Sequence, residues 1–235
     1  MHASQNHQNQ SGHMQDRLSL APEAAAQEIA LRSLSVAAHK RQRILVGIAG
    51  GPGSGKSTLA ADVIGLLNDR IDGSAARVPM DGFHMKQAKL EAEELEAHKG
   101  APQTFEADAF VQLLKTLKSA RSPVSVPGYS RRIEDVVPNA FTIAGNVPIL
   151  VVEGNYLLLD TPPWNEIPGI LDLSFFLHVS PDVTRARLLR RHAEHGRFQP
   201  DWIERHVEKV DMVNYEAVEA SSPHADVRID LKVER

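Results

Sequence analysis

Short apolar runs alternate with longer amphipathic segments along most of this chain. Five of the runs predict buried strands, which cover 43–49, 76–81, 149–154, 173–179 and 226–231. The run ILVVEG at 149–154 is the clearest, because an unbroken aliphatic, β-branched series is typical of a strand buried on both faces. The segments between the runs predict helices at 21–39, 57–68, 104–118, 181–195 and 201–219.

Strands that alternate with helices indicate parallel βαβ units. We therefore expect an α/β fold with a doubly wound, mostly parallel five-stranded sheet and helices on both faces. Its ligands should bind at the carboxyl edge of the sheet. The charged residues 85–98 are helix-prone, whereas 121–147 contain several prolines and predict an extended, loop-rich excursion.

The beginning of the chain is polar and rich in His, Gln, Asn and Ser. This composition predicts a disordered tail over 1–16, followed by a single domain over 17–235. His2, His7 and His13 could chelate a metal ion, but a solvated tail is the interpretation that the composition favours.

The bulk composition narrows the function classes. The chain has 235 residues, 42% of them hydrophobic, and a net charge of −4, so it can bury a sizeable core but lacks the positive field of a nucleic-acid-binding protein. It has no cysteine, which excludes disulfides and fits a cytoplasmic location. No apolar run is long enough for membrane insertion.

A phosphate-binding pattern lies between the first predicted strand and the next helix. Gly50 is followed, after four residues, by Gly55-Lys56-Ser57, which is the P-loop spacing. The glycines let backbone N–H groups converge on phosphates, and the helix N-terminus adds a positive dipole. Lys56 is suited to neutralise phosphate oxygens, and the Ser57 hydroxyl to bind Mg²⁺. The residues expected to bind ATP are Gly51, Gly53, Ser54, Gly55, Lys56, Ser57 and Thr58.

Two acidic residues close strands that we expect beside this loop. Asp81 ends ARVPMD, and Glu153 ends ILVVE. A nucleotide hydrolase needs one acid to hold Mg²⁺, and a kinase needs a second acid to accept the proton of the acceptor hydroxyl. Asp81 could instead form a turn before Gly82, and the local sequence leaves both interpretations open.

Four further segments occur in a specific order: MDGFHM (80–85), HKGAPQTFEADAF (98–110), PGYSRRIEDVVPNA (127–140) and VVEGNYLLLD (151–160). Together with GGPGSGKST they resemble the P-loop kinase family of uridine kinases, bacterial pantothenate kinases and phosphoribulokinases. The resemblance is closest to a bacterial subgroup of nucleoside/nucleotide kinase-like proteins, some of which are labelled fructose transport system kinase. It implies a P-loop NTPase fold that uses ATP and Mg²⁺.

The resemblance also implies roles for single residues. Asp81 matches the acid that orients or deprotonates the acceptor hydroxyl, and Glu153 matches the acid of the Mg²⁺ shell. Tyr129 and Arg131 belong to a segment that contacts the acceptor and reads Tyr-Ser-His in pantothenate kinases. Arg131 therefore stands where those enzymes have a histidine.

The segment RARLLRRHAEHGR (185–197) resembles the arginine-bearing lid of this family, which implies a lid over about 185–200. Arg187 and Arg191 are four residues apart and share a helix face. In a lid, they are suited to stabilise charge on the transferred phosphoryl group. The other interpretation of each arginine is a solvated basic face.

His192 and His195 in the same segment could suggest a metal site. A third ligand is not evident nearby in the sequence, and we therefore expect both histidines on the surface.

The excursions at about 82–105 and 121–147 are expected to form the acceptor side, with His84, Tyr129, Arg131 and Arg132 as binding residues. Adjacent arginines suit an anionic group, but they could equally pair with the nearby Glu134 and Asp135. His84 could bind an acceptor hydroxyl or be a structural histidine.

These observations favour an ATP- and Mg²⁺-dependent kinase, with Asp81, Lys56, Arg187 and Arg191 as its catalytic residues. The acceptor would be a hydroxyl of a small metabolite: a sugar such as fructose, a sugar phosphate, a nucleoside or a pantothenate-like acid. A P-loop ATPase or nucleotide-dependent switch is the alternative, and a degenerate fold that only binds ligands is a third hypothesis. Relatives are often dimers, so a homodimer is a further expectation.

Overall fold

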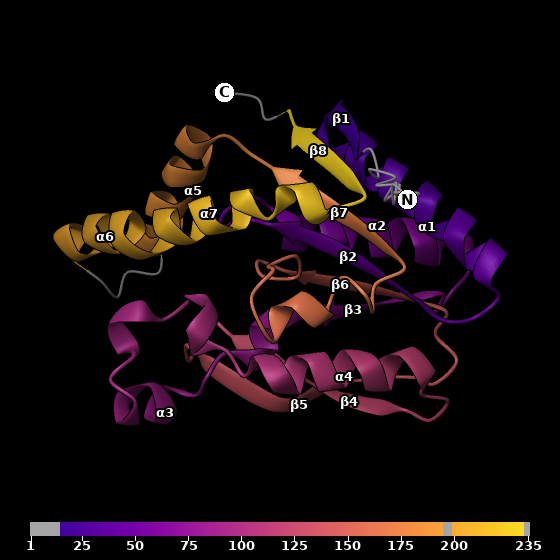
Figure 1. Ribbon diagram of the computed structural model, residues 1–235, viewed down its shortest axis with the longest axis horizontal. Helices are drawn as coiled ribbons and strands as arrows, with labels where there is room; N and C mark the ends of the chain where they lie inside the picture. The colour runs from indigo at the N-terminus through magenta and orange to yellow at the C-terminus, as the bar shows by residue number, and fades with distance from the viewer. Residues whose placement is uncertain (1–14, 195–198, 233–235) are drawn as a thin grey trace, which may run out of the picture.

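A six-stranded parallel sheet forms the centre of the protein (Figure 1). The computed structural model describes residues 15–194 and 199–232. The strand order is β1-β8-β7-β2-β6-β3, and every neighbouring pair is parallel. The strands are β1 (Asp16–Leu20), β2 (Ile44–Gly50), β3 (Ala75–Pro79), β6 (Ile149–Gly154), β7 (Leu173–His178) and β8 (Val227–Leu231).

Five of these strands correspond to the five apolar runs, and β1 is the strand that the sequence pattern missed. Its sequence DRLSL has only two apolar residues, and it lies at the edge of the sheet, where it pairs with β8. The predicted tail therefore ends too late, because Asp16 already begins β1 and Gln15 donates hydrogen bonds to two backbone carbonyls. Residues 1–14 lie outside the described part of the chain.

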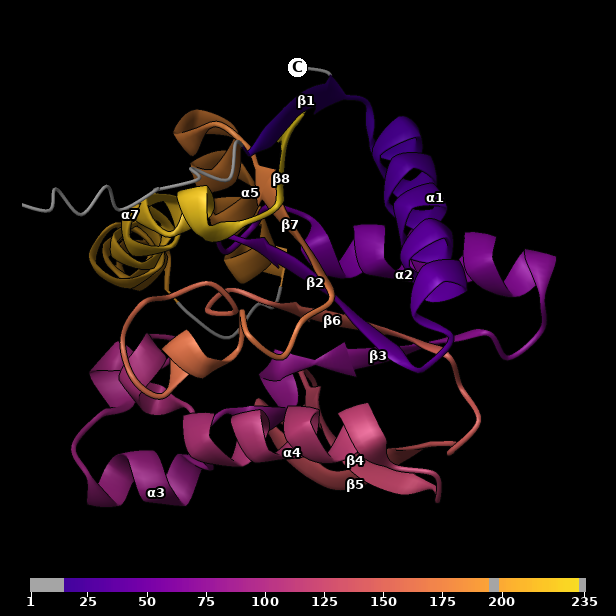
Figure 2. The same cartoon turned by 45° about the vertical axis from the view of Figure 1, so that its right-hand side comes forward.

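Helices cover both faces of the sheet, as predicted, and Figure 2 shows the resulting layers. Side chains alternate along β2. Ile44, Val46 and Ile48 pack against α1 and α2 on one face of the sheet, whereas Leu45 and Ala49 join the apolar core that α4 covers on the other face. The helices are α1 (Pro22–Lys40), α2 (Lys56–Arg70), α3 (Gln87–Ala92), α4 (Ala107–Ser119), α5 (Pro181–Glu194), α6 (Pro200–His206) and α7 (Met212–Ala220). Within the described residues, none of these helices is long and apolar enough to cross a membrane.

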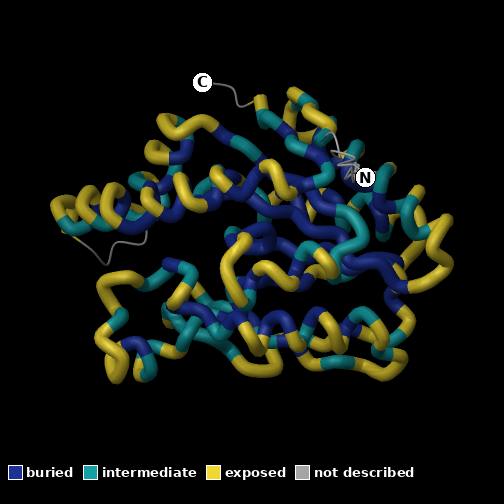
Figure 3. The backbone as a smooth tube through the Cα atoms, in the orientation of Figure 1, coloured by how far each residue is buried: buried dark blue, intermediate teal, exposed yellow. Residues whose placement is uncertain are grey.

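Burial follows the layers, since Figure 3 shows the central strands as the most buried part of the backbone. The predicted helix over 85–98 is much shorter than expected, with α3 covering six of its residues. The predicted helix 201–219 contains an internal π-helical turn, Val207–Asp211, between α6 and α7.

The excursion at 121–147 is a β-hairpin of β4 (Val124–Ser130) and β5 (Asp135–Ile143). It lies against a short 3₁₀ helix, Met80–Phe83, that directly follows β3. The strand predicted over 76–81 thus ends at Pro79, and Asp81 lies in the 3₁₀ helix. A Cβ atom on Gly82 would lie 2.3 Å from the Pro127 carbonyl oxygen, so glycine is what permits this close approach.

The hairpin contact predicts that Gly82→Ala destabilises the protein. The added methyl group would force the backbones of β4 and the 3₁₀ helix apart, at a cost of about 1–3 kcal/mol, typical of overpacking. Urea unfolding measures this change. Gly65→Ala is the matched control, because a Cβ on this exposed α2 glycine meets no neighbouring atom. The control should gain about 0.5–1 kcal/mol, and equal stability of the two variants would contradict the contact.

Candidate active site

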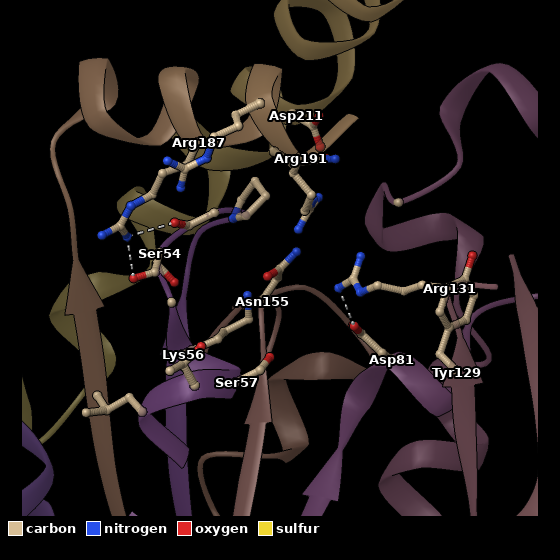
Figure 4. A pocket seen from close by; sticks show the side chains of 18 of the residues that line it. Ser54, Lys56, Ser57, Asp81, Tyr129, Arg131, Asn155, Arg187, Arg191 and Asp211 are labelled. Carbon is tan, nitrogen blue, oxygen red and sulfur yellow. Dashed lines mark hydrogen bonds and ion pairs between the residues drawn. The ribbon is translucent and has the colours of Figure 1, made fainter. Parts of the chain in front are cut away.

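A cavity of about 710 Å³ opens at the carboxyl edge of β2, β3 and β6 (Figure 4). It is lined by the loop before α2, the 3₁₀ helix after β3, hairpin β4–β5, and helices α5 to α7. The predicted residues that line it are Gly53, Ser54, Gly55, Lys56, Ser57, Thr58, Asp81, His84, Tyr129, Arg131, Arg187 and Arg191. The fold therefore brings most of the predicted site together from four segments of the chain.

The glycine-rich loop has the conformation that a phosphate cradle requires. Gly53 and Gly55 have φ angles of 73° and 92°, a left-handed region that favours glycine. The turn at Gly55 leads directly into α2, whose free N-terminal N–H groups and positive dipole face the cavity edge. Lys56 Nζ donates a hydrogen bond to the Gly51 carbonyl, 3.3 Å away.

A buried acid lies directly beneath this loop. The Ser57 hydroxyl donates to Glu153 Oε2 at 2.8 Å, and Glu153 is 2% exposed. Burial raises the pKa of Glu153, and burial lowers the pKa of Lys56, while the mutual attraction of the two groups opposes both shifts. The hydroxyl and the carboxylate offer only oxygen ligands, which is the donor set that Mg²⁺ prefers. The residues present thus fit the predicted magnesium site.

Asp81 faces the cavity from the opposite side, where Arg131 forms an ion pair with it at 3.8 Å (Figure 4). Both side chains are partly exposed, so this pair is weak and easily exchanged for a ligand. The acids that could have held Arg131 locally have other contacts: Glu134 accepts from the Tyr129 hydroxyl at 2.9 Å, and Asp135 accepts from the Val136 N–H. Arg131 is thus directed into the cavity.

His84 lies between two aromatic rings on the acceptor side. Its ring centroid is 4.0 Å from that of Phe105 and 4.7 Å from that of Tyr129. Burial lowers the pKa of His84, which favours the neutral ring. Because Nδ1 lies 2.8 Å from the Asp81 carbonyl, which can only accept, Nδ1 carries the proton and Nε2 is left as an acceptor. Nε2 could therefore accept a hydrogen bond from an acceptor hydroxyl.

The two predicted lid arginines differ in their contacts. Arg187 donates to the carbonyls of Gly53 and Ser54 at 3.1 and 3.3 Å, which ties α5 to the phosphate loop. Arg191 extends into the cavity between Asn155 and Arg131 (Figure 4). Burial lowers the pKa of both guanidinium groups, but an arginine remains charged at physiological pH.

Three predicted residues do not line the cavity. Gly51 begins the loop, and its carbonyl accepts a hydrogen bond from Lys56. Glu153 lies beneath the loop and accepts a hydrogen bond from Ser57. Arg132, unlike its neighbour Arg131, is not among the lining residues, although both lie in the turn between β4 and β5. The structure therefore does not bring Arg132 together with the other predicted acceptor residues.

The cavity also contains residues that sequence reasoning missed. Asn155 follows the β6 strand at its carboxyl end, where the topology of the fold could have indicated it. Lys99 and Phe105 lie in the segment 98–110 that carried the family resemblance, but they were not singled out there. Asp211 gave no local signal, since only the tertiary fold brings its helical turn to the site.

Comparisons with known proteins agree with this arrangement. The model of the phosphoribulokinase / uridine kinase family matches residues 45–232. A Schizosaccharomyces pombe protein, provisionally named a uridine kinase, is 36% identical over 208 residues, which cover 85% of this chain and 88% of that protein. The pantothenate kinase of Levilactobacillus brevis is 30% identical over 154 residues, which cover 65% of this chain and 50% of that enzyme. The crystal structure of a provisionally named fructose transport system kinase from Silicibacter sp. TM1040 has a TM-score of 0.76 and 32% identity, over 89% of this chain and 98% of that one.

The buried position of Glu153 predicts that Glu153→Gln stabilises the ligand-free protein. Glutamine can keep the Ser57 hydrogen bond without a buried charge, and gains of about 0.5–2 kcal/mol are usual for such changes at functional sites. The pKa of Glu153 is raised, so its ionised form costs stability only as the pH rises above the unfolded-state value of about 4.3. The gain should therefore be larger at pH 8 than at pH 5.

Urea unfolding in EDTA at the two pH values measures this gain. Glu93→Gln is the control, because Glu93 is exposed and only loosely paired with Lys89. With Mg-ATP added, Glu153→Gln should lose most of the ligand-induced stabilisation that the parent protein shows. A variant that is less stable at both pH values without ligand would contradict the argument from burial.

Proposed function

The chain belongs to the phosphoribulokinase / uridine kinase family, and from that premise we propose that it transfers the γ-phosphoryl group of ATP to a hydroxyl of a small, anionic metabolite. The observation that carries this proposal is the shared cavity of Lys56, Asp81 and Arg131. It joins a phosphate cradle, an acid and a cationic acceptor side within one space.

The donor side of the cavity holds the nucleotide in this proposal. Backbone N–H groups from Gly53 to Thr58 and the ammonium of Lys56 bind its phosphates, and Ser57 and Glu153 hold Mg²⁺. The bound metal supplies charge neutralisation of the phosphates. Arg191, which extends into the cavity, stabilises the charge that develops on the transferred group. Arg187 positions the lid helix on the loop through its two carbonyl contacts.

Asp81 is the group that we assign to the acceptor hydroxyl. Its carboxylate faces the cavity opposite the phosphate loop, and its ion pair with Arg131 is long, at 3.8 Å. A carboxylate in that place can accept the proton of a hydroxyl as the phosphoryl group is transferred. An ATPase or a nucleotide-dependent switch would need no such acid beside a separate acceptor pocket.

The charge on the acceptor side supports an anionic substrate. Lys99 and Arg131 line it together with the aromatic rings of His84, Phe105 and Tyr129. When an acceptor carries a phosphate or carboxylate, that group can take over the guanidinium of Arg131 and leave Asp81 to the hydroxyl. A sugar phosphate or a hydroxy acid fits this surface better than a neutral nucleoside or an unmodified sugar such as fructose. The cytoplasmic location and the homodimer stay predictions.

The assignment of Asp81 to the acceptor hydroxyl can be tested by turnover. Purified protein with Mg-ATP should release ADP only when the correct acceptor is present in a panel of sugars, sugar phosphates, nucleosides and pantothenate. Asp81→Asn should lower this turnover about 10²–10⁴-fold, the usual contribution of a general base, and should leave ATP affinity nearly unchanged. Asp69→Asn, an exposed change on α2, is the control. Acceptor-independent hydrolysis that survives Asp81→Asn would favour the ATPase or switch instead.

The negative charge proposed for the acceptor can be tested at Arg131. Arg131→Ala should raise the KM for an anionic acceptor about 10–100-fold, because a hydrogen bond to a charged group contributes about 1.5–3 kcal/mol. The KM for ATP should change little. Arg132→Ala is the matched control, since Arg132, unlike its neighbour Arg131, lies outside the cavity lining. Steady-state kinetics on the best acceptor decide this point, and equal effects of the two substitutions would exclude the assigned contact.

A further inference from the structure

A cluster of two histidines and one aspartate joins the lid helix to the helices beside it. His192 lies on α5, His206 ends α6, and Asp211 ends the π-helical turn. Their possible ligand atoms all lie within 4.8 Å of one another. The sequence led us to expect His192 on the surface, but its side chain is 14% exposed, so that expectation is wrong. His195 lies outside the described residues.

The side chains of this cluster are held in place. His192 Nε2 lies 2.9 Å from Asp211 Oδ2, and the Asp211 side chain is 11% exposed. The His206 ring stacks on Trp202, with centroids 4.6 Å apart and an angle of 9° between the planes. It also meets the His192 ring edge to face at 5.4 Å. The three groups are thus oriented toward one another by packing as well as by a hydrogen bond.

The π-helical turn is the reason that His206 and Asp211 face the same way. The two residues are five positions apart, which in an α-helix would separate them by about 140° around the axis. A π turn has i→i+5 hydrogen bonds, so residues five apart lie above one another. The turn Val207–Asp211 therefore brings the carboxylate over the imidazole. Such turns are rare, and those that occur are often found at functional sites.

The donor set is characteristic of a transition metal. Two imidazoles and a carboxylate are ligands that Zn²⁺ binds well, whereas Mg²⁺ and Ca²⁺ prefer oxygen alone. Burial lowers the pKa of His206, and a neutral ring is the form that binds a metal. The cluster therefore differs in chemistry from the Ser57–Glu153 pair, which offers oxygen atoms only.

We propose that His192, His206 and Asp211 form a binding site for a transition-metal ion, with Zn²⁺ as the preferred ion. Bound there, the ion would join α5 to the α6–α7 segment directly behind Arg191. His206 and Asp211 also line the nucleotide cavity, so the ion would fix the end of the lid helix that carries this arginine. The proposal goes beyond the proposed kinase function and does not depend on it.

Calorimetric titration of the purified protein with Zn²⁺ tests the site without any enzymatic activity. The full chain is used without an affinity tag, and with His2, His7 and His13 changed to Gln, so that these histidines do not contribute binding. Excess Mg²⁺ is present throughout to compete at oxygen-only sites. The test variants are His206→Gln and His192→Gln. His39→Gln is the control, because His39 is exposed on α1 and its Nδ1 bonds to the Ser35 carbonyl of the same helix.

We expect one Zn²⁺ per chain in the parent protein and in the His39 variant. Each test variant should bind at least about tenfold more weakly, since even changes that only support a ligand cost about 10–100-fold in affinity. Zn²⁺ at about 100 times its dissociation constant should raise the thermal midpoint of the parent by about 5–10 °C. The midpoint of the variants should barely respond.

Two results would overturn the proposal. One is the absence of a saturable site in the parent protein, which would leave His192 and Asp211 as a hydrogen-bonded brace. The other is a parent-like affinity in both histidine variants, which would place the ion elsewhere. If the circular dichroism of these variants shows that they fail to fold, Asp211→Asn decides between the outcomes. Asparagine can keep the hydrogen bond to His192 but removes the charged ligand.

Discussion

The site depends on the buried contact between the phosphate loop and the acid at the end of β6. Glu153 is buried and Lys56 is half-buried at the cavity wall, and burial raises the pKa of the acid and lowers the pKa of the lysine. The Ser57 hydrogen bond compensates this cost only in part. Such an arrangement lowers the stability of the ligand-free protein. It suits a site for phosphates and Mg²⁺, because the bound ligands would neutralise the two charges.

Three segments complete the cavity around that contact: hairpin β4–β5, the 3₁₀ helix after β3, and α5. Gly82 lets hairpin β4–β5 approach the 3₁₀ helix after β3, and this approach aims Arg131 at Asp81. From the other side, Arg187 ties the lid helix to the carbonyls of the loop, and Arg191 extends inward. Three arginines thus have different contacts because of their backbone positions: Arg187 bonds to the loop, Arg191 extends into the cavity, and Arg131 pairs with Asp81.

The α6–π–α7 segment packs against α5, the helix that carries both predicted lid arginines. A single irregular turn rotates Asp211 onto the side of His206, next to His192 and the nucleotide cavity. Irregular helical turns cost folding stability, so they persist mainly where the geometry that they produce is used. Here the turn collects a carboxylate and two imidazoles behind a lid arginine, a combination that a regular helix would have separated.

The sequence by itself determined five of the six strands of the central sheet and the phosphate loop. Five strands and the loop were predictable because periodicity and glycine spacing are local properties, and the acids at the strand ends followed from the topology of parallel sheets. Only the tertiary structure decided the short edge strand β1, the separation of Arg131 from Arg132, and the cluster around Asp211. These depend on strand pairing, on the path of the turn between β4 and β5 and on the register of a helix, none of which leaves a pattern in the local sequence.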